Sequence, residues 1–396
     1  MEAPNATFLP RRRALLLGGA AALALAACDR SQPAANGPAA SDPASPTPSP
    51  EPTTPAPSPD SPTPTPARSP GGGGDPRVAK TLLTGLNTPW GLAFLPDGSA
   101  LLGSRDRATV LHVRPDGSTS DAGTVPGLSG TAGGGGEGGL LGFALSPDFR
   151  TDRTVFCYLT AQGDNRVLRG TFTDGKVGDF QPIVTDIPSG RIHNGGGLLV
   201  HGGALWIGTG ESGDPDLAQQ RSSLGGKVLR VDFDGEPAPG NPFDDRVYSF
   251  GHRNIEALAV HGDQVWAVEF GQNRLDELNA IKSGANYGWP MHEGPADDDG
   301  FIDPAQTWPT SDCGPAGIAI VGDFAFVAGL TGNRLFRVPI DGTSAGEPEA
   351  FFDQEFGRIR RVSLAPDGHL WLTTSNTDGR GEVRDGDDRL LLVSID

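Results

Sequence analysis

The fold is indicated by a short unit, a polar turn followed by an apolar strand, first seen as Leu95-Pro96-Asp97-Gly98-Ser99-Ala100-Leu101-Leu102. The unit recurs five more times, at residues 146–158, 202–207, 262–268, 322–327 and 366–372. Gly, Asp and Pro favour turns, and short runs of aliphatic and aromatic residues favour strands. Successive units are roughly 40 to 60 residues apart, the length of one four-stranded propeller blade. Six units therefore predict an all-β, six-bladed β-propeller.

Two other arrangements, a β-sandwich and a pair of separate β-domains, would not explain why one unit recurs. We therefore assign residues 77–396 to the propeller. A region of this length is too long for a single hydrophobic core unless it is built from repeated units. In a propeller, the loops at one end of the central channel converge. Residues that are far apart in the sequence can then line one pocket, which is where function is usually sited.

The chain begins with a targeting segment. Arg11-Arg12-Arg13 precedes an apolar run that ends in Leu25-Ala26-Ala27-Cys28, so residues 1–28 resemble a bacterial lipoprotein signal, and the arginines favour a twin-arginine export route. Cleavage before Cys28 would leave this cysteine as the lipidation site. The exported protein would then be anchored to the outer face of the cytoplasmic membrane rather than span it. An ordinary signal peptide of a secreted protein is the alternative.

Residues 29–76 separate this signal from the propeller. They are rich in Pro, Ser, Thr and Ala and contain Gly71-Gly72-Gly73-Gly74 near their end. Too few apolar residues are present to offset the entropy of ordering the segment. Its prolines favour an extended conformation, which at about 3 Å per residue would hold a domain on the order of 100 Å from a membrane. We interpret the segment as a disordered stalk without chemistry.

The charge of the chain limits the partners that it can bind. The formal net charge is −18, nearly all of it carried by residues after 76. Affinity for nucleic acid depends on neutralising phosphates with Lys and Arg, so this acidic composition predicts no nucleic-acid partner. The same composition fits an exported protein that binds calcium.

Two cysteines, Cys157 and Cys313, lie within the predicted propeller. Export would permit a disulfide between them, but two cysteines far apart in the sequence do not establish one. Each is equally well explained as a buried apolar filler.

The candidate catalytic residue lies in the segment Arg191-Ile192-His193-Asn194-Gly195-Gly196-Gly197-Leu198. Glycines permit a tight backbone path and the close approach of a flat ligand. Histidine is the side chain best suited to moving protons near neutral pH. Taken alone, the segment is also explained as a glycine-rich turn with an incidental histidine.

Four further segments fall on predicted loops. They are Gly136-Glu137-Gly138-Gly139-Leu140, Gly251-His252-Arg253-Asn254, a stretch from Glu269-Phe270-Gly271-Gln272 to Asn286-Tyr287-Gly288-Trp289-Pro290, and Gly357-Arg358-Ile359-Arg360-Arg361. With the histidine turn, and in this order, they resemble the soluble glucose and aldose sugar dehydrogenases that depend on pyrroloquinoline quinone (PQQ), the glucose/sorbosone dehydrogenase family. The resemblance runs from about Leu82 to the C-terminus and rests on the joint occurrence of these segments.

The resemblance implies a reaction and the residues that perform it. Oxidation of the anomeric carbon of an aldose to a lactone releases a hydroxyl proton, which a general base accepts, and a hydride, which the quinone accepts. The family has its base at the position of His193. Arg253 and Asn254 match a pair near the reacting carbon and the quinone oxygens, where Arg253 would stabilise developing negative charge.

The resemblance also implies how PQQ, a tricarboxylate, is held. Arg358 and Arg360 match the family's cofactor-binding arginine pair, and guanidinium groups bind carboxylates in bidentate pairs. Because they are two positions apart, both would point the same way from an extended strand. Alternating surface charges on an edge strand are the other interpretation of this pair. Glu137 stands beside the cofactor and the base, where some members have glutamine, and Thr310 would donate a hydrogen bond to the cofactor.

Two calcium sites follow from the resemblance. The carbonyls of Gly271 and Gln272 match those that hold the ion at the quinone, and oxygen ligands suit Ca²⁺. The family has proline at position 272, a change that a carbonyl ligand tolerates. The Glu277 carboxylate and the Tyr287 carbonyl match a second, structural site. Solvated surface charge is the alternative interpretation of Asp276 and Glu277.

One departure from the family affects the cofactor directly. Thr331 stands where the glucose enzyme has a cofactor-binding lysine, and the loss of one charge-assisted contact costs about 1.5–3 kcal/mol. Arg334, three residues further along the chain, is a candidate for replacing this cation.

The favoured interpretation is an exported, lipid-anchored enzyme that oxidises aldose sugars with bound PQQ and Ca²⁺. Its electrons would pass to a separate acceptor, because the chain contains no haem-attachment motif. A cell-surface propeller that only binds a glycan or a protein partner is the main alternative. A calcium-dependent lactonase with a propeller fold is a third interpretation, but it does not account for Arg358 and Arg360.

Overall fold

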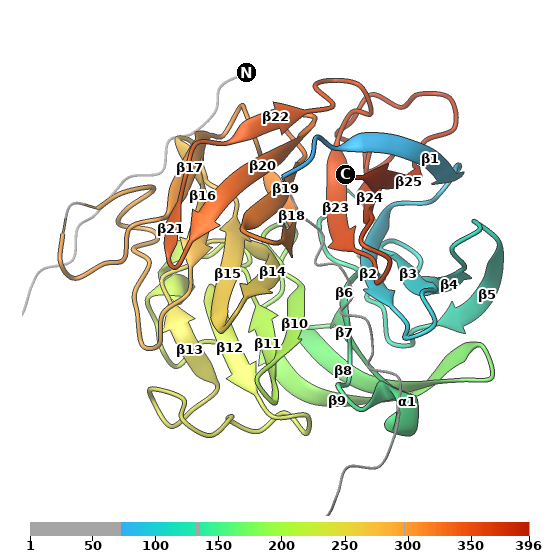
Figure 1. Ribbon diagram of the computed structural model, residues 1–396. Coiled ribbons are helices and arrows are strands. Elements are labelled where there is room, and N and C mark those ends of the chain that lie inside the picture. The colour runs from blue at the N-terminus through green and yellow to red at the C-terminus, as the bar shows by residue number, and fades with distance from the viewer. Residues whose placement is uncertain (1–72, 131–134, 297, 396) are drawn as a thin grey trace, which may run out of the picture. The chain divides into compact units, whose positions relative to one another are not determined.

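Six antiparallel sheets, five of four strands and one of five, are arranged around a central axis in the computed structural model of the chain (Figure 1). The structure describes residues 73–130, 135–296 and 298–395, all of which belong to the compact unit Pro66–Asp396. The predicted signal segment, Cys28 and the predicted stalk up to residue 72 lie outside the described residues. The predicted six-bladed β-propeller is confirmed.

The first three blades follow one another along the chain. Blade 1 consists of β2 (Pro89–Phe94), β3 (Ala100–Ser104), β4 (Thr109–Val113) and β5 (Thr119–Thr124). Blade 2 consists of β6 (Leu140–Leu145), β7 (Thr154–Thr160), β8 (Asn165–Thr173) and β9 (Lys176–Ile187), with the short helix α1 (Phe149–Asp152) between β6 and β7. Blade 3 consists of β10 (Gly197–His201), β11 (Ala204–Gly208), β12 (Lys227–Val231) and β13 (Val247–Phe250), with the 3₁₀ helix η1 (Pro215–Ala218) between β11 and β12.

The second half of the ring repeats this pattern. Blade 4 consists of β14 (Ile255–His261), β15 (Gln264–Glu269), β16 (Leu275–Ala280) and β17 (Gln306–Pro309). Blade 5 consists of β18 (Pro315–Val321), β19 (Phe324–Gly329) and β20 (Arg334–Asp341), with the short strands β21 (Ser344–Ala345) and β22 (Glu349–Phe351) both paired to β20. Blade 6 consists of β23 (Ile359–Leu364), β24 (Leu370–Thr374), β25 (Leu390–Ser394) and β1 (Arg77–Leu83).

The ring is closed by strands from the two ends of the propeller domain. Strand β1 pairs antiparallel with β25, from Arg77 opposite Ser394 to Leu83 opposite Leu390, so the first strand completes the last blade. Figure 1 shows the blue strand β1 beside the red strand β25. The inner strands of successive blades are in contact around the whole ring, including β2 with β23. This closure gives the last blade its fourth strand and joins the two ends of the domain.

The recurring sequence unit has the same place in every blade. Each time, it supplies the connection between the first two strands, which in blade 2 includes α1 and is a short turn in the other blades. It then supplies the second strand itself, which is β3, β7, β11, β15, β19 or β24. In the first unit, the amide of Gly98 donates to the carbonyl of Leu95 at 3.0 Å, and Gly98 has a φ of 84°. Glycine adopts this left-handed conformation without a Cβ penalty.

Adjacent blades pack through apolar side chains, and the second strands are almost completely buried. Trp266, Phe326 and Trp371, one from each of the last three blades, are among the largest fully buried side chains. Cys157 and Cys313 are free and lie in different clusters of the core. Both therefore act as buried apolar residues rather than as a disulfide, and burial raises the pKa of each thiol.

The up-and-down order of the strands gives the propeller two different ends. The loops after the second and fourth strands lie at one end, which we call the site end, and the remaining turns lie at the opposite end, the turn end. His193, Arg253, Gln272 and Arg358 all lie on loops of the site end. No helix among the described residues is long and apolar enough to cross a membrane.

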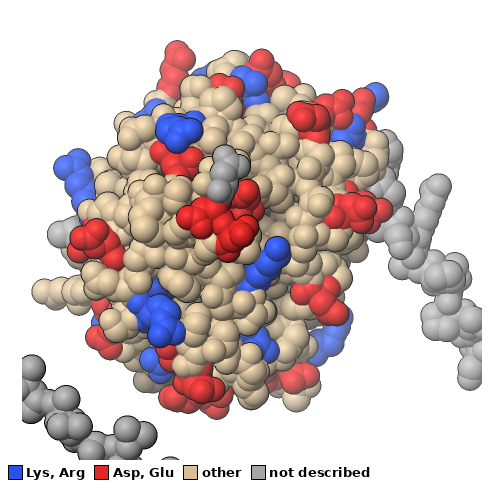
Figure 2. Space-filling model, turned by 90° about the vertical axis from the view of Figure 1, so that its left-hand side faces the viewer, with Lys and Arg blue, Asp and Glu red and all other residues tan. Residues whose placement is uncertain are grey.

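The outer surface carries charges of both signs. On the face shown in Figure 2, Asp and Glu side chains are spread over the surface, whereas Lys and Arg side chains occur singly or in small groups. This face therefore has no continuous basic patch.

Candidate active site

His193 lies in the loop between β9 and β10 and is held by its backbone. Its φ is 55°, and its amide donates to Glu137 Oε2 at 2.6 Å, while its carbonyl accepts from the amide of Ser212 at 2.9 Å. The following Gly195 packs so closely on the loop after β11 that a Cβ there would lie 2.6 Å from the backbone of Thr209. The glycines of this segment therefore allow the turn to be pressed against the neighbouring loop.

The imidazole of His193 is fixed at both nitrogens. Nδ1 lies 2.7 Å from Glu211 Oε1, and Nε2 lies 2.9 Å from Arg253 Nη2. A guanidinium group can only donate, so Nε2 must accept, and Nδ1 must carry the proton that is shared with Glu211. The carboxylate of Glu211 is buried, with the residue only 1% exposed. The neutral ring is thereby held in the tautomer that has its lone pair on Nε2.

Arg253 is oriented toward His193 by a set of acceptors. Its Nε lies 3.0 Å from Gln272 Oε1, to which Nη2 also donates, and its Nη1 donates to the carbonyl of Phe270 at 3.0 Å. The guanidinium carbon lies 5.6 Å from the ring centre of Trp289. Burial lowers the pKa of Arg253, an effect that nearby carboxylates, Glu211 first, oppose. The side chain of Gln272, where the sequence suggested a role only for the carbonyl, therefore positions Arg253.

The two predicted cofactor arginines share one carboxylate. Arg358 precedes β23 and Arg360 lies within it, and their Nη2 atoms lie 3.2 and 3.7 Å from Asp378 Oδ2. Burial opposes ionisation of Asp378, but the two guanidinium groups outweigh it and lower its pKa. The side chains thus lie on the same side of the chain, as their spacing predicts. Asp378 itself was not predicted.

Glu256, on the inner strand β14, connects this arginine pair to the loop of His193. Arg360 Nη1 forms an ion pair with Glu256 Oε2, and Asn254 Nδ2 lies 3.4 Å from Glu256 Oε1. Asn254 Oδ1 in turn accepts from the amide of Gly195 at 2.9 Å. Burial raises the pKa of Glu256, and Arg360 opposes this shift. A continuous network therefore runs from the histidine turn to the arginine pair across the ring.

Glu137 closes the network on its other side. Its Oε1 lies 2.6 Å from Arg380 Nη1, on the loop between β24 and β25, while its Oε2 holds the amide of His193. Burial opposes ionisation of Glu137, but the bond from the His193 amide and the charge of Arg380 lower its pKa below the ordinary value. Glu137 is therefore ionised and links the histidine turn to a cation that was not predicted.

A pocket at the site end lies beside this network. Three guanidinium groups line it, those of Arg358, Arg380 and Arg384, together with Thr331 and Asn333. One carboxylate, that of the exposed Glu382, also lines it, whereas Arg360, whose Nε is buried without a hydrogen-bond partner among the described residues, does not. Such a set of donors fits a ligand with several carboxylates. The residues present therefore fit PQQ.

Arg334 and Thr310 stand apart from this network. Arg334 is not among the lining residues of the pocket, and its Nη2 pairs with Asp353 at 2.9 Å. Its predicted compensating role therefore has no support in its position. Thr310 follows β17, the outermost strand of blade 4, and its amide donates to the carbonyl of Arg274 at 3.3 Å. No hydrogen bond among the described residues links it to His193 or Arg253.

The loop with Gly271 and Gln272 is fixed from both sides. The amide of Gly271 donates to Asp276 Oδ1 at 2.9 Å, and the carboxylate of Glu293 accepts from Gln272, Asn273 and Arg274 at 2.6, 2.8 and 2.9 Å. Among the described residues, no three or more His, Cys, Asp or Glu side chains converge to hold a metal ion. A calcium ion here would therefore depend on backbone or cofactor oxygens, as the resemblance implies.

The second predicted calcium position shows a feature that favours a cation. Glu277 is buried, and burial together with the nearby Glu269 raises its pKa to about 8. Beside it, Asn279 donates to Glu277 Oε2 at 3.0 Å, while Asn279 Oδ1 is buried without a partner among the described residues. An unpaired amide oxygen next to a buried carboxylate suits a hard cation. Tyr287 lies nearby and stacks on His252, with ring centres 4.4 Å apart. The residues therefore fit Ca²⁺.

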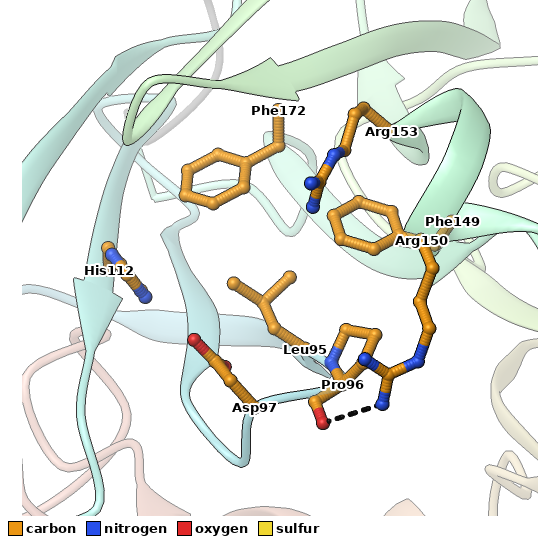
Figure 3. Close-up of a pocket in the computed structure, with 8 residues that line it drawn as sticks. All are labelled: Leu95, Pro96, Asp97, His112, Phe149, Arg150, Arg153 and Phe172. Carbon is orange, nitrogen blue, oxygen red and sulfur yellow. Dashed lines mark hydrogen bonds between the residues drawn. The ribbon is translucent and has the colours of Figure 1, made fainter.

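Another pocket, at the turn end, has a different character. Figure 3 shows Arg150 and Arg153 on one side of it, His112 and Asp97 on the other, and Leu95, Phe149 and Phe172 between them. Arg150 Nη2 donates to the carbonyl of Pro96 at 3.1 Å. None of the predicted site residues lines this pocket. The site-end network is therefore the candidate active site.

Several residues of the site were missed in the sequence. Glu211, Asp378, Arg380 and Arg384 all lie on loops that follow the second strand of a blade, and Glu256 lies on an inner strand. A usable signal was present for the first four, because polar and charged residues follow the second strands of blades 3 and 6 within a few positions. Their partners lie on other blades, however, so their pairing required the structure.

Comparison with known proteins identifies the class to which this fold and site belong. The model of the glucose/sorbosone dehydrogenase family matches residues 86–391, and the chain therefore belongs to this family. It is similar to the aldose sugar dehydrogenase of Streptomyces coelicolor, whose PQQ-bound structure is known, with 48% identity and a TM-score of 0.79 over 83% of this chain and 100% of that one.

Two further relatives have names of the same kind. The aldose sugar dehydrogenase YliI of Escherichia coli is 28% identical over 74% of this chain and 89% of that protein. The quinoprotein glucose dehydrogenase B of Acinetobacter calcoaceticus is 30% identical over 56% of this chain and 54% of that protein. The family resemblance inferred from the sequence is thus confirmed.

Proposed function

We propose that the chain oxidises the anomeric carbon of aldose sugars to lactones, with PQQ and Ca²⁺ bound at the site end. The observation that carries this proposal is the arrangement of His193, whose Nδ1 is bound by Glu211 and whose Nε2 lies 2.9 Å from Arg253 Nη2. The comparisons support the same activity, because two of the named relatives, from Streptomyces coelicolor and Escherichia coli, are aldose sugar dehydrogenases. PQQ, when bound, supplies the acceptor for the hydride that leaves the sugar.

His193 accepts the proton of the sugar hydroxyl in this proposal. Its lone pair is on Nε2 and accepts from Arg253 Nη2 in this structure, so the sugar hydroxyl must replace this hydrogen bond before its proton can be transferred. The buried carboxylate of Glu211 stabilises the imidazolium that forms on proton transfer, because it lies against Nδ1 at 2.7 Å. Arg253 donates to negative charge that develops beside Nε2, and its own position is fixed by Gln272 and Phe270.

The remaining groups bind and orient. Arg358, Arg360 and Arg380 would hold the carboxylates of PQQ, and Asn254 would contribute its amide, while Glu137 keeps Arg380 and the histidine turn together. The carbonyls of Gly271 and Gln272 would bind the Ca²⁺ at the quinone. Glu277 and the Tyr287 carbonyl would bind the structural Ca²⁺. We assign Thr310 no direct part in proton transfer, since it follows β17, the outermost strand of its blade.

The location of the protein is part of the proposal. A signal in residues 1–28 with lipidation at Cys28 would place the enzyme outside the cytoplasmic membrane, with residues 29–76 as its tether. Sugars reach it there without transport, and electrons would pass to a separate acceptor. Labelling with a radioactive fatty acid, compared between the natural chain and Cys28→Ala, tests the anchor.

The activity is tested by reconstitution. The purified propeller is loaded with PQQ and Ca²⁺, and reduction of an artificial dye is followed with a panel of aldoses. Sugar-dependent reduction supports the proposal. If no sugar reduces the dye and none bleaches the absorbance of bound PQQ, the enzymatic proposal is wrong.

A second function, a cell-surface propeller that only binds a glycan or a protein, is favoured by one observation. The resemblance implies a cofactor-binding lysine at the position where this chain has Thr331, and a pocket that no longer binds PQQ would also lack this cation. Equilibrium dialysis against PQQ separates the two functions, because a binding module has no reason to retain the quinone.

A further inference from the structure

The pocket at the site end contains one cation whose charge is not neutralised. Arg358 pairs with Asp378, and Arg380 pairs with Glu137. Arg384 has no carboxylate within ion-pair distance among the described residues, although it lines the same pocket. The residue is partly exposed and the contacts of its guanidinium are exposed, so a ligand in the pocket can reach this group.

Arg384 is nevertheless held in place. Its Nη1 donates to the carbonyls of Gln354 and Glu355 at 3.1 and 2.8 Å, and its backbone amide donates to Asp387 Oδ2 at 2.8 Å. These contacts use one nitrogen of the guanidinium and orient the group, whereas Nη2 and Nε make no hydrogen bond to the described residues. A fixed arginine with unused donors is prepared to bind an anion.

Thr331 and Arg384 contribute to the same pocket from different loops. Thr331 lies between β19 and β20, whereas Arg384 lies between β24 and β25. A threonine hydroxyl offers one neutral donor, while a guanidinium offers a charge and a planar pair of donors. The carboxylate Glu382, which also lines the pocket, is exposed and forms no ion pair among the described residues. The loop between β19 and β20 thus offers the pocket a neutral threonine, whereas the loop between β24 and β25 offers it the cation of Arg384.

We propose that Arg384 binds a carboxylate of PQQ and so replaces the lysine that this chain lacks at Thr331. This inference rests on the proposed function and assigns the charge compensation to the loop between β24 and β25, rather than to Arg334. The same loop carries Asp378, which binds Arg358 and Arg360. The loop between β24 and β25 thus binds the predicted cofactor pair, Arg358 and Arg360, through Asp378 and also carries Arg384.

The test measures cofactor affinity rather than turnover. Binding of PQQ to the natural propeller, Arg384→Ala and Arg384→Lys is followed by equilibrium dialysis in the presence of Ca²⁺. We expect Arg384→Ala to raise the Kd for PQQ about 10- to 100-fold, the effect of one charge-assisted contact. Arg384→Lys should recover part of the affinity. Arg334→Ala, which removes an arginine of the same end that pairs with Asp353, is the matched control and should leave the Kd unchanged.

A second variant separates ligand binding from a structural role. Introducing Thr331→Lys into the Arg384→Ala protein returns a cation from the other loop without restoring the bonds to Gln354 and Glu355. Recovered affinity supports the inference, because a merely structural defect would persist. If Arg384→Ala binds PQQ as the natural protein does, or if Thr331→Lys restores nothing, the inference is wrong while the proposed function stands. If the natural protein itself does not bind PQQ, the proposed function fails, and this inference fails with it.

Discussion

Nη2 of Arg253 lies 2.9 Å from Nε2 of His193. The other ring nitrogen, Nδ1, carries the proton and donates it to Glu211, so Nε2 is the nitrogen without a proton. Arg253 and His193 come from loops of adjacent blades, 60 positions apart in the sequence. Because the guanidinium can only donate, this contact defines the tautomer of the histidine. It also places a positive charge where an alkoxide would develop as the sugar hydroxyl loses its proton.

The first prediction concerns His193 as the base. His193→Ala should lower kcat about 10²- to 10⁴-fold, the usual contribution of a general base, with PQQ still bound. Dye reduction by the reconstituted protein measures the effect. His201→Ala is the control, since His201 ends β10 at the turn end and its imidazole lies 3.9 Å from Asp263, away from the site-end loops. An unchanged kcat in His193→Ala would exclude this residue as the base.

The second prediction concerns Glu211. Glu211→Gln retains an oxygen that can accept from Nδ1 but removes the negative charge, whereas Glu211→Ala removes both. We expect kcat to fall about 10-fold or more in the first variant and further in the second, because the imidazolium loses its stabilising charge and then its orientation. Equal activities of the two variants would mean that the carboxylate charge and the hydrogen bond do not contribute separately.

The third prediction concerns the side chain of Gln272. Gln272→Ala removes the oxygen that accepts from Nε and Nη2 of Arg253 but retains the backbone carbonyl. We expect kcat to fall about 5- to 30-fold, the effect of one or two hydrogen bonds to a charged group, while the Kd for Ca²⁺ stays the same. Gln264→Ala, at the first position of β15 and at the turn end, is the control. A changed affinity for Ca²⁺ with normal kcat would contradict the positioning role.

The fourth prediction concerns the pH dependence of stability without calcium. Burial raises the pKa of Glu277 from 4.5 to about 8, so between these pH values the folded domain binds a proton that the unfolded chain has released. The free energy of unfolding should therefore fall as the pH rises from about 4.5 to about 8, by at most about 1.4 kcal/mol per pH unit. Urea unfolding in the presence of a chelator measures it.

Calcium and a neutral side chain should both remove this slope. Ca²⁺ stabilises the ionised carboxylate, so its addition should raise the stability more at pH 8 than at pH 5. Glu277→Gln should flatten the dependence, whereas Glu347→Gln, at an exposed position, should not. An identical slope in Glu277→Gln would show that other groups cause it.

The six repeated units could be predicted from the sequence, but the pairing of β1 with β25 that closes the ring could not. The six turn-strand units mark the second strand of every blade because those strands are buried on both sides and follow tight turns. Strand β1 has no comparable signal, since most of its residues are exposed and only Leu82 is buried. Its place beside β25 depends on pairing between the two ends of the domain, which no local pattern encodes.

Site residues that stand in a recognisable sequence motif could be predicted. Residues whose role depends on a contact with a distant residue could not. His193, Arg253, Arg358 and Arg360 stand in recognisable segments. Glu256 and Asp378 belong to the site because each forms an ion pair with an arginine from another part of the chain. The role of Gln272 was assigned to its carbonyl, since the sequence gives no sign that its amide oxygen reaches Arg253.

The direction of β1 has a consequence for access. Its C-terminal residue, Leu83, leads through a loop of the site end into β2, so its first residue, Arg77, lies at the turn end. Whatever precedes Arg77 therefore joins the propeller on the side away from His193. If the preceding residues tether the protein as we propose, the tether is attached at the turn end and leaves the loops of the site end accessible to a sugar and to an electron acceptor.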